Sequence, residues 1–344
     1  MEGVSTPNQR SDRLVLAANP AYWDPTRFPR LQRIIFDNTL EQKEAVELVK
    51  TSEGRVDLVT GLSPLETLRV AQSPFANVVK ARGSLGTVFG MFNMRKTGSP
   101  WRDVRLRQAV NYAINREDLI RYAAKGNGVV VPALVAPEGF GYDPALTPYP
   151  FDPGRARHLL RQAGYPDGLA VTLIATEDLG VQATVVGKML EQVGFQVEVQ
   201  LLDPAAYNRR TVLSHLEQPP EQQPWDLALM ATLDIQNFPV YLLYNYFALD
   251  GPYDWVLERP ELPQFYAQAL RTVDQQQQQG VIRQMERHTH DQAYFLFLYN
   301  PINLYAVSKT VAFEPYVTGN LILAETGVTE DHWSVRKQKA AAQE

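Results

Sequence analysis

The 344-residue sequence contains no cysteine. Disulfide bonds, thiolate metal sites, cysteine nucleophiles and a lipid-modified cysteine are therefore excluded from it. It also lacks any apolar run close to the roughly 20 residues that a membrane-spanning helix needs. The polar segment MEGVSTPNQRSDR at its start has no apolar core of the kind that a secretion signal carries.

An excess of positive charge is missing as well. The 33 lysines and arginines are outnumbered by 38 aspartates and glutamates, which gives a net charge of −5 with the two signs well mixed. Nucleic-acid-binding proteins usually carry a basic patch or stripe, so the charge pattern predicts no nucleic-acid partner. The 45% hydrophobic and 21% charged composition is that of a folded globular protein. The length predicts about two domains of roughly 150 residues each.

Short motifs of catalysis and cofactor binding are absent too. The sequence has no GxSxG nucleophile turn, no GxxxxGK[ST] phosphate loop and no GxGxxG dinucleotide fingerprint. His288 and His290 are two residues apart, so on a helix they would point in nearly opposite directions. A helical zinc site needs histidines four residues apart. We therefore predict no catalytic residue, no metal site and no cofactor, and the sequence motifs do not favour an enzyme.

Hydrophobic patterning in the first hundred residues alternates strand and helix. Residues 14–18 and 31–36 are short apolar runs that fit strands by their length and flanks. Thr39 and Gln42 have the spacing of a capping box at the start of a helix, and residues 56–59 are the next apolar run. A strand, a helix and a strand in this order predict an α/β fold.

Helix signals are clearest after residue 100. Asp103, Asn115 and the pair Asp152-Pro153 each precede an apolar stripe at helical spacing, which is typical of a helix start. The glutamine run 275–279 lies between apolar helical positions and is interpreted as the polar face of a helix. Further apolar runs predict a helix over 185–193 and strands at 195–202, 226–232 and 294–299.

Several of these segments together resemble one protein family. Residues 92–120, FNMRKTGSPWRDVRLRQAVNYAINREDLI, are similar to the signature region of the extracellular solute-binding proteins that include the oligopeptide-, dipeptide- and nickel-binding proteins of ABC importers. The matching positions are Asn93, Pro100, Asp103, Val104, Arg105, Arg107, Gln108, Ala109, Ile114, Asn115 and Arg116. Three further segments match in the same order: Asn19-Pro20-x-Tyr22-Trp23, Gly54-x-x-Asp57, and residues 149–168 with Asp152-Pro153 and Ala163-Gly164-Tyr165.

The resemblance implies an α/β fold like that of periplasmic binding proteins of type II, in the peptide-binding class. It implies a polar leader at 1–11, a truncated first lobe from 12–93 and 299–344, and a complete second lobe at 94–298. Family members carry an N-terminal strand set and an extra subdomain ahead of the Asn-Pro-x-Tyr-Trp segment. We therefore expect either a fragment or a protein whose first lobe another polypeptide completes.

The resemblance also implies a ligand site and a hinge. Asp234 follows the 226–232 strand and corresponds to an aspartate that holds the free amine of a peptide. Its alternative role is a helix N-cap. Arg209 and Arg210, which follow Tyr207, correspond to a basic residue for ligand carboxylates, although either arginine could also be a solvated surface residue. Tyr207, Trp225 and Tyr241 are expected to take part in the site. For Trp225 and Tyr241 the alternative is a place in the core. Asn93 and Asn300 are expected at the two hinge crossings.

The predicted function is therefore that of a peptide-type solute-binding subunit, or a fragment of one, that captures its ligand between two lobes. Its expected partners are a small peptide or similar solute, the membrane subunits of an ABC importer, and a polypeptide that completes the first lobe. The resemblance implies a periplasmic or extracellular location. The alternative hypothesis is an accessory subunit that uses a truncated binding-protein fold as a protein-docking domain.

Overall fold

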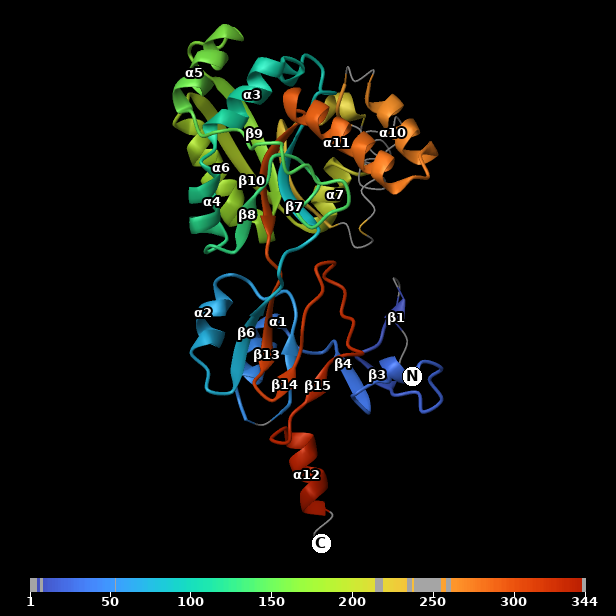
Figure 1. The fold of residues 1–344 in the computed structure, drawn as a ribbon. Helices are drawn as coiled ribbons and strands as arrows, with labels where there is room; N and C mark the ends of the chain where they lie inside the picture. Colours follow the sequence, from blue (N-terminus) through green and yellow to red (C-terminus); the bar gives the residue numbers. More distant parts are fainter. Residues whose placement is uncertain are drawn as a thin grey trace. The chain divides into compact units, whose positions relative to one another are not determined.

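The chain divides into two compact units, which are described separately here. A computed structural model describes residues 5–6, 9–52, 54–213, 219–233, 237, 255–257 and 261–341. The first unit contains Met1–Arg82 and Ile302–Glu344, and the second unit contains Gly83–Pro301 (Figure 1). These boundaries differ from the expected ones, because residues 83–93 lie in the second unit. Residues 86–92 among them form a central strand of its sheet.

Small sheets organise the first unit. β3 (Arg13–Ala17) pairs antiparallel with β4 (Arg33–Asp37). β5 (Leu58–Val59), β13 (Leu304–Ser308) and β6 (Ala76–Lys80) form a three-stranded antiparallel sheet in that order. The remaining elements are β1 (Ser5–Thr6), β2 (Gln9–Arg10), η1 (Pro25–Arg27), α1 (Gln42–Val49), α2 (Glu66–Ala71), β14 (Val311–Ala312), β15 (Gly327–Val328) and α12 (Trp333–Ala341).

The core of this unit is small. It consists of short aliphatic side chains from α1, α2 and the three-stranded sheet: Val46, Val49, Val59, Leu62, Val70, Ala76, Leu304 and Ala306. The strand from the end of the chain, β13, lies between strands from its beginning, so the two parts of the unit fold as one.

The predicted capping box at the start of α1 is wrong. The helix is capped at Glu41, without a side-chain hydrogen bond. The Thr39 hydroxyl donates instead to Asp37 at 2.6 Å, and the amide of Gln42 donates to the backbone oxygen of Thr60 at 3.1 Å. Asp37 thus competes successfully for the hydroxyl that the box required.

A six-stranded sheet forms the centre of the second unit, in the order β10-β9-β11-β7-β12-β8. β9 (Leu169–Thr176), β10 (Phe195–Leu202) and β11 (Leu227–Leu233) run parallel to one another, and β7 (Gly86–Phe92) runs antiparallel to β11 and to β12 (Phe295–Pro301). β8 (Gly128–Val130) completes the edge. Every residue of β7 is buried, as expected for a central strand covered on both faces.

The helices of the second unit confirm most of the sequence signals. Asp103, Asn115 and Asp152 each accept a backbone N–H as the N-cap of the following helix. The glutamine run opens the long helix α11, as predicted.

The helices described in the second unit are α3 (Val104–Ala113), α4 (Arg116–Ala123), α5 (Pro153–Gln162), α6 (Gly180–Glu191), α7 (Pro204–Arg210), α10 (Leu262–Arg271) and α11 (Gln275–Asp291), with short turns η2 (Pro100–Arg102), η3 (Glu177–Leu179) and η4 (Pro220–Gln222). Figure 1 shows α3, α4, α5 and α6 grouped on one side of the sheet.

Two arginines of the resembling segment join these helices to neighbouring backbone segments. Arg116 is fully buried and donates to the backbone oxygen of Phe297 on β12 at 2.6 Å and to that of Tyr149 at 3.0 Å. Burial lowers the pKa of Arg116 to about 10. Arg107 donates to the backbone oxygens of Trp101 and Gln292. Both side chains bind backbone carbonyls, which indicates a structural role.

Candidate functional site

The sheet of the second unit has two ends with different surroundings. Across the β11–β7 pair, Leu233 lies opposite Gly86 and Leu227 lies opposite Phe92. Seven residues of strand separate these ends by roughly 20 Å. β9 is parallel to β11, so the carboxyl ends of both strands lie at the Gly86 end. We call this end the carboxyl edge. Ligands of open α/β sheets bind at the carboxyl ends of their parallel strands, so this edge is the candidate site.

Both connections to the first unit leave the second unit at the carboxyl edge. Ser84 lies two residues before β7 begins. Asn300 is the second-last residue of β12, which ends at Pro301. The buried amide of Asn300 donates to the backbone oxygen of Ser84 at 3.0 Å, to its hydroxyl at 2.9 Å and to the backbone oxygen of Gly86. The Ser84 hydroxyl donates to the backbone oxygen of Pro301 at 2.6 Å. Asn300, one predicted hinge residue, therefore lies beside a crossing.

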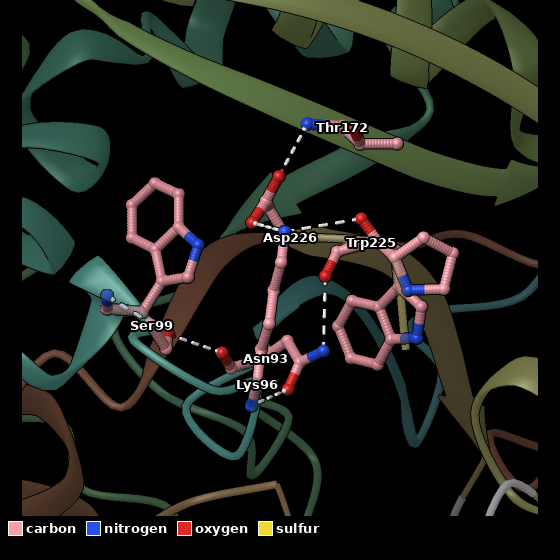
Figure 2. Close-up of polar contacts among 8 residues, drawn as sticks. Asn93, Lys96, Ser99, Thr172, Trp225 and Asp226 are labelled. Carbon is pink, nitrogen blue, oxygen red and sulfur yellow. Dashed lines mark hydrogen bonds and ion pairs between the residues drawn. The ribbon is translucent and has the colours of Figure 1, made fainter. Parts of the chain in front are cut away.

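Asn93, the other predicted hinge residue, lies at the opposite end of the sheet. Its side-chain amide donates to the backbone oxygen of Trp225 at 3.1 Å, and its side-chain oxygen accepts the backbone N–H of Lys96 at 2.9 Å (Figure 2). The Ser99 hydroxyl donates to the backbone oxygen of Asn93 at 2.6 Å. Asn93 is fully buried. Asn93 is fixed within the second unit and lies far from both crossings. We therefore correct its assignment: Asn93 is not a hinge residue but anchors the turn after β7.

An ion pair accompanies Asn93 at this end. The Lys96 ammonium lies 2.9 Å from the Asp226 carboxylate, and the other carboxylate oxygen accepts the backbone N–H of Thr172 at 2.9 Å (Figure 2). Asp226 is 7% exposed. The network joins the turn after β7 to Thr172 within β9 and to Asp226, the residue before β11. It fixes three strands in register, and its groups are all paired, which favours a structural role over ligand binding.

Two predicted ligand residues, Tyr207 and Trp225, lie in the core of the second unit. The Tyr207 hydroxyl donates to the backbone oxygen of Leu229 at 2.8 Å, and the Trp225 indole donates to the backbone oxygen of Arg210 at 2.9 Å. Trp225 is 0% exposed and packs edge-on against Trp255, with ring centroids 4.6 Å apart. Their placement corrects the expectation that they line a ligand site. Both residues belong to the core, where their hydrogen bonds anchor α7 to β11 and to the residue that leads into it.

The two predicted arginines differ in their surroundings. Arg210 donates to the side chain of Gln200 on β10 at 3.1 Å, whereas Arg209 is exposed. Asp203 caps α7 directly after the carboxyl end of β10, and both arginines lie in the last turn of that helix. Seven helical residues place that turn roughly 10 Å from the cap. The predicted Asp234 and Tyr241 lie outside the described residues, as do the neighbouring positions on which their assignment depends.

Polar side chains that the sequence reading missed lie near the carboxyl edge. The side-chain amide of Gln182, in the first turn of α6, donates to the Tyr299 hydroxyl of β12 at 3.0 Å. Burial raises the pKa of Tyr299. Glu177 and Asp178 follow β9 with exposed side chains. The signal that could have found these residues is their position directly after a strand in a parallel sheet, which requires the strand order.

A buried carboxyl lies elsewhere in the same unit. Glu286 of α11 accepts the backbone N–H of Val135 at 2.8 Å, and burial raises its pKa to about 7. Nearby, Arg287 lies 2.5 Å from Asp143, and this contact lowers the pKa of Asp143. These contacts join α11 to the 131–150 segment.

Metal and membrane sites have no support in the described part of the chain. No group of three or more histidine, aspartate or glutamate side chains there is arranged to hold a metal ion. None of the helices described is long and apolar enough to cross a membrane.

Solved structures identify the fold. The crystal structure of the ABC transporter substrate-binding protein CtaP from Listeria monocytogenes matches with a TM-score of 0.81 at 17% identity, over 94% of this chain and 65% of CtaP. The periplasmic binding protein DppA from Helicobacter pylori, in complex with the peptide STSA, matches with a TM-score of 0.73 at 22% identity, over 93% of this chain and 61% of DppA. The fold is therefore that of the periplasmic peptide-binding proteins of type II, as predicted.

The sequence identifies the family. Residues 6–254 match the middle region of the bacterial extracellular solute-binding proteins, family 5, and the chain belongs to this family. The glutathione-binding protein GsiB of Pectobacterium atrosepticum is 29% identical over 185 residues, which are 53% of this chain and 35% of GsiB. The chain thus spans about a third of the length of the curated relatives that it matches.

Proposed function

We propose that the protein is a solute-binding subunit of an ABC importer and that its solute is a small peptide or a peptide-like molecule. The family match over residues 6–254 carries this proposal. Relatives support the solute class, since GsiB is named for glutathione and the DppA structure contains a peptide. Binding, and not catalysis, is the proposed activity.

The charge of the carboxyl edge supports a solute with an ammonium group. Glu177 and Asp178 follow β9, and Asp203 follows β10. Three carboxylates at one edge favour the approach of a cation. A charge-assisted hydrogen bond to an ammonium group contributes roughly 1.5–3 kcal/mol. Asp234 remains the proposed direct ligand of that group, with Arg209, Arg210 and Tyr241 as proposed contacts for the rest of the solute.

The family resemblance supplies the remaining parts of the proposal. The solute is captured by closure of two lobes and delivered to the membrane subunits of the importer, in the periplasm or outside the cell. The first lobe is completed by strands from a further polypeptide segment. Two observations support this last point: β3 and β4 form a sheet of only two strands, and Trp23 and Ile35 beside them are 83% and 45% exposed. A two-stranded sheet is marginally stable by itself.

A thermal-shift titration of the full chain tests the proposal. Glutathione, the peptide STSA and pools of dipeptides are the probes, and the free amino acids serine, threonine and alanine are the controls. A ligand at 100 times its dissociation constant adds about 2.7 kcal/mol of stability, which appears as a higher Tm. Asp234→Asn should abolish the shift, and the matched variant Arg121→Gln, on the exposed face of α4, should retain it.

A folded sample whose Tm responds to none of these probes contradicts solute binding. The exposed Trp23 would then favour the second candidate function, an accessory subunit that docks another protein through the first unit. Analytical ultracentrifugation of the chain with the other subunits of its transport system distinguishes the two, because a docking subunit co-sediments without any peptide present.

A further inference from the structure

The first unit contains a cavity that has no part in the proposed solute site. Its volume is about 250 Å³. Residues of four separate segments line it: 51, 52, 54 and 56; 74 and 75; 308–310; and 331, 333 and 336. All of them belong to the first unit, and none includes a residue predicted to bind the solute.

Contacts among these segments hold the cavity walls in place. Gly54 has a φ of +68°, and a Cβ atom there would collide with the Trp333 ring, so the indole packs directly on the glycine backbone. The buried His332 lies 3.1 Å from the Asp57 carboxylate, which also accepts from the Trp333 indole at 3.4 Å. The Gly54-x-x-Asp57 turn therefore positions the start of α12.

A further backbone contact fixes the opposite wall. The backbone N–H of Lys309 donates to the backbone oxygen of Phe75 at 2.8 Å. The two residues thereby join the segments at 74–75 and 308–310. A site assembled before its ligand arrives loses less conformational entropy on binding.

Among the residues that the structure describes, the charged side chains that line the cavity are mostly positive. They are those of Lys309, Arg336 and Asp331. Within the described part of the chain, the Arg336 guanidinium makes no hydrogen bond or ion pair, and the Lys309 ammonium contacts only the backbone oxygen of Ser73, at 3.3 Å. Both cations therefore retain donors for a ligand. Lys337 adds a third positive charge beside the cavity, 5.1 Å from the centre of the Trp333 ring.

Hydroxyl groups complete the lining. The Ser308 and Thr310 hydroxyls lie 2.9 Å apart, and Ser52 contributes a third, whereas the Thr51 hydroxyl donates to the backbone oxygen of Leu48 at 2.8 Å. A hydroxyl can rotate to donate to a ligand oxygen. Flexible ammonium, planar guanidinium and hydroxyl donors together suit a phosphate, sulfate or carboxylate group.

We propose that this cavity binds a small oxyanion. Lys309 and Arg336 neutralise its charge. Of the hydrogen-bonded hydroxyls of Ser308 and Thr310, the one that does not donate to the other donates to an oxygen of the anion. Anion binding in this cavity does not depend on the proposed peptide-like solute. The experiments below therefore test it separately from the proposed function.

Isothermal titration calorimetry of the full chain, without peptide, tests the proposal. Sodium phosphate, sodium sulfate and sodium acetate are titrated in turn, with sodium chloride holding the ionic strength constant because salt screens exposed charges. Saturable binding of phosphate and sulfate would assign a tetrahedral oxyanion, and saturable binding of acetate would assign a carboxylate. Binding of neither kind overturns the proposal.

Variants locate the site. Lys309→Gln and Arg336→Gln should each raise the dissociation constant about tenfold or more, since each removes a charge-assisted hydrogen bond. Lys339→Gln is the matched control, because Lys339 lies on the same helix but pairs with Glu330 at 3.0 Å and does not line the cavity. It should bind as the unaltered protein does. Equal weakening in all three variants would mean unspecific attraction to the positive charge of this surface and would overturn the site.

Discussion

Ser84 and Asn300 are hydrogen-bonded to each other at the point where both connections leave the second unit, with the Asn300 amide 2.9 Å from the Ser84 hydroxyl. The two residues are far apart in sequence: Ser84 follows the point where the chain enters the second unit, and Asn300 precedes the point where it leaves. Both are buried. The pair therefore fixes the spacing of the two connecting segments where they meet the second unit.

The Ser84–Asn300 pair should be energetically coupled. We expect Asn300→Ala to lower the free energy of unfolding by about 1–3 kcal/mol, because it leaves buried acceptors unpaired. Ser84→Ala removes a hydroxyl that both accepts from Asn300 and donates to Pro301, and it should cost a similar amount. Urea denaturation of both single variants and the double variant measures the coupling. Additivity within about 0.5 kcal/mol would show that the two side chains act independently.

The Asp226–Lys96 pair should stabilise the fold without affecting solute binding. Asp226→Asn removes the partner of Lys96 and weakens the bond to the Thr172 N–H, so we expect a loss of about 1–3 kcal/mol in urea denaturation. The affinity for any peptide identified by thermal shift should not change, because the pair lies at the end of the sheet opposite the carboxyl edge.

An exposed ion pair provides the control for this experiment. Arg82 and Glu314 lie 3.3 Å apart with side chains that are 88% and 78% exposed, so Arg82→Gln should change stability by less than about 1 kcal/mol. A large drop in peptide affinity in Asp226→Asn, at unchanged stability, would contradict the structural role.

Local signals in the sequence predicted much of the fold. Asp103, Asn115 and Asp152 cap helices as expected, because a cap depends on a few neighbouring backbone groups. The Thr39–Gln42 capping box failed for the same local reason, since Asp37 binds the Thr39 hydroxyl first. The boundary between the two units could not be predicted from short stretches of sequence. Strand β7 belongs to the second unit because it pairs with β11 and β12, which come more than a hundred residues later.

The site was harder to predict than the fold. Asn93 matches the family signature, but its contacts with Trp225 and Lys96 explain that match as the anchoring of a turn. Aromatic residues such as Trp225 suit a core and a ligand site equally well by composition, and only the packing against Trp255 separates the two. Which residues share the carboxyl edge depends on strand order, which no short window of sequence contains.

Arg116 should be irreplaceable by lysine. Its guanidinium donates to the backbone oxygens of Phe297, Tyr149 and Asn111 from a fully buried position. A lysine ammonium carries the same charge but has three donors and no planar fork. We expect Arg116→Lys to lower the free energy of unfolding by about 2–4 kcal/mol, measured by urea denaturation. Arg121→Lys, on the exposed face of the same helix, is the control and should be nearly neutral. Equal stabilities of the two variants would contradict the structural role of Arg116.

The buried Glu286 should make the protein less stable as the pH rises. Burial and the negative charge of Asp143 raise its folded-state pKa to about 7, above the ordinary value of 4.5. Between these two values the folded state binds more protons than the unfolded state, so the stabilisation is complete below pH 4.5 and is lost as the pH rises to 7. Glu286→Gln retains an oxygen for the Val135 N–H and has no charge to bury. Its stability relative to the unaltered protein should therefore increase by on the order of 2–3 kcal/mol between pH 4.5 and pH 8.

His290, on the same helix, provides a control of opposite sign. Burial lowers its folded-state pKa below the ordinary value of 6.5, so its contribution is complete above pH 6.5 and is lost as the pH falls. The stability of His290→Gln relative to the unaltered protein should therefore increase on the acid side, where that of Glu286→Gln does not. Urea denaturation of the three proteins at several pH values from 4.5 to 8 separates the two effects. Parallel stability curves for Glu286→Gln and the unaltered protein would mean that the Glu286 carboxyl titrates alike in the folded and unfolded states.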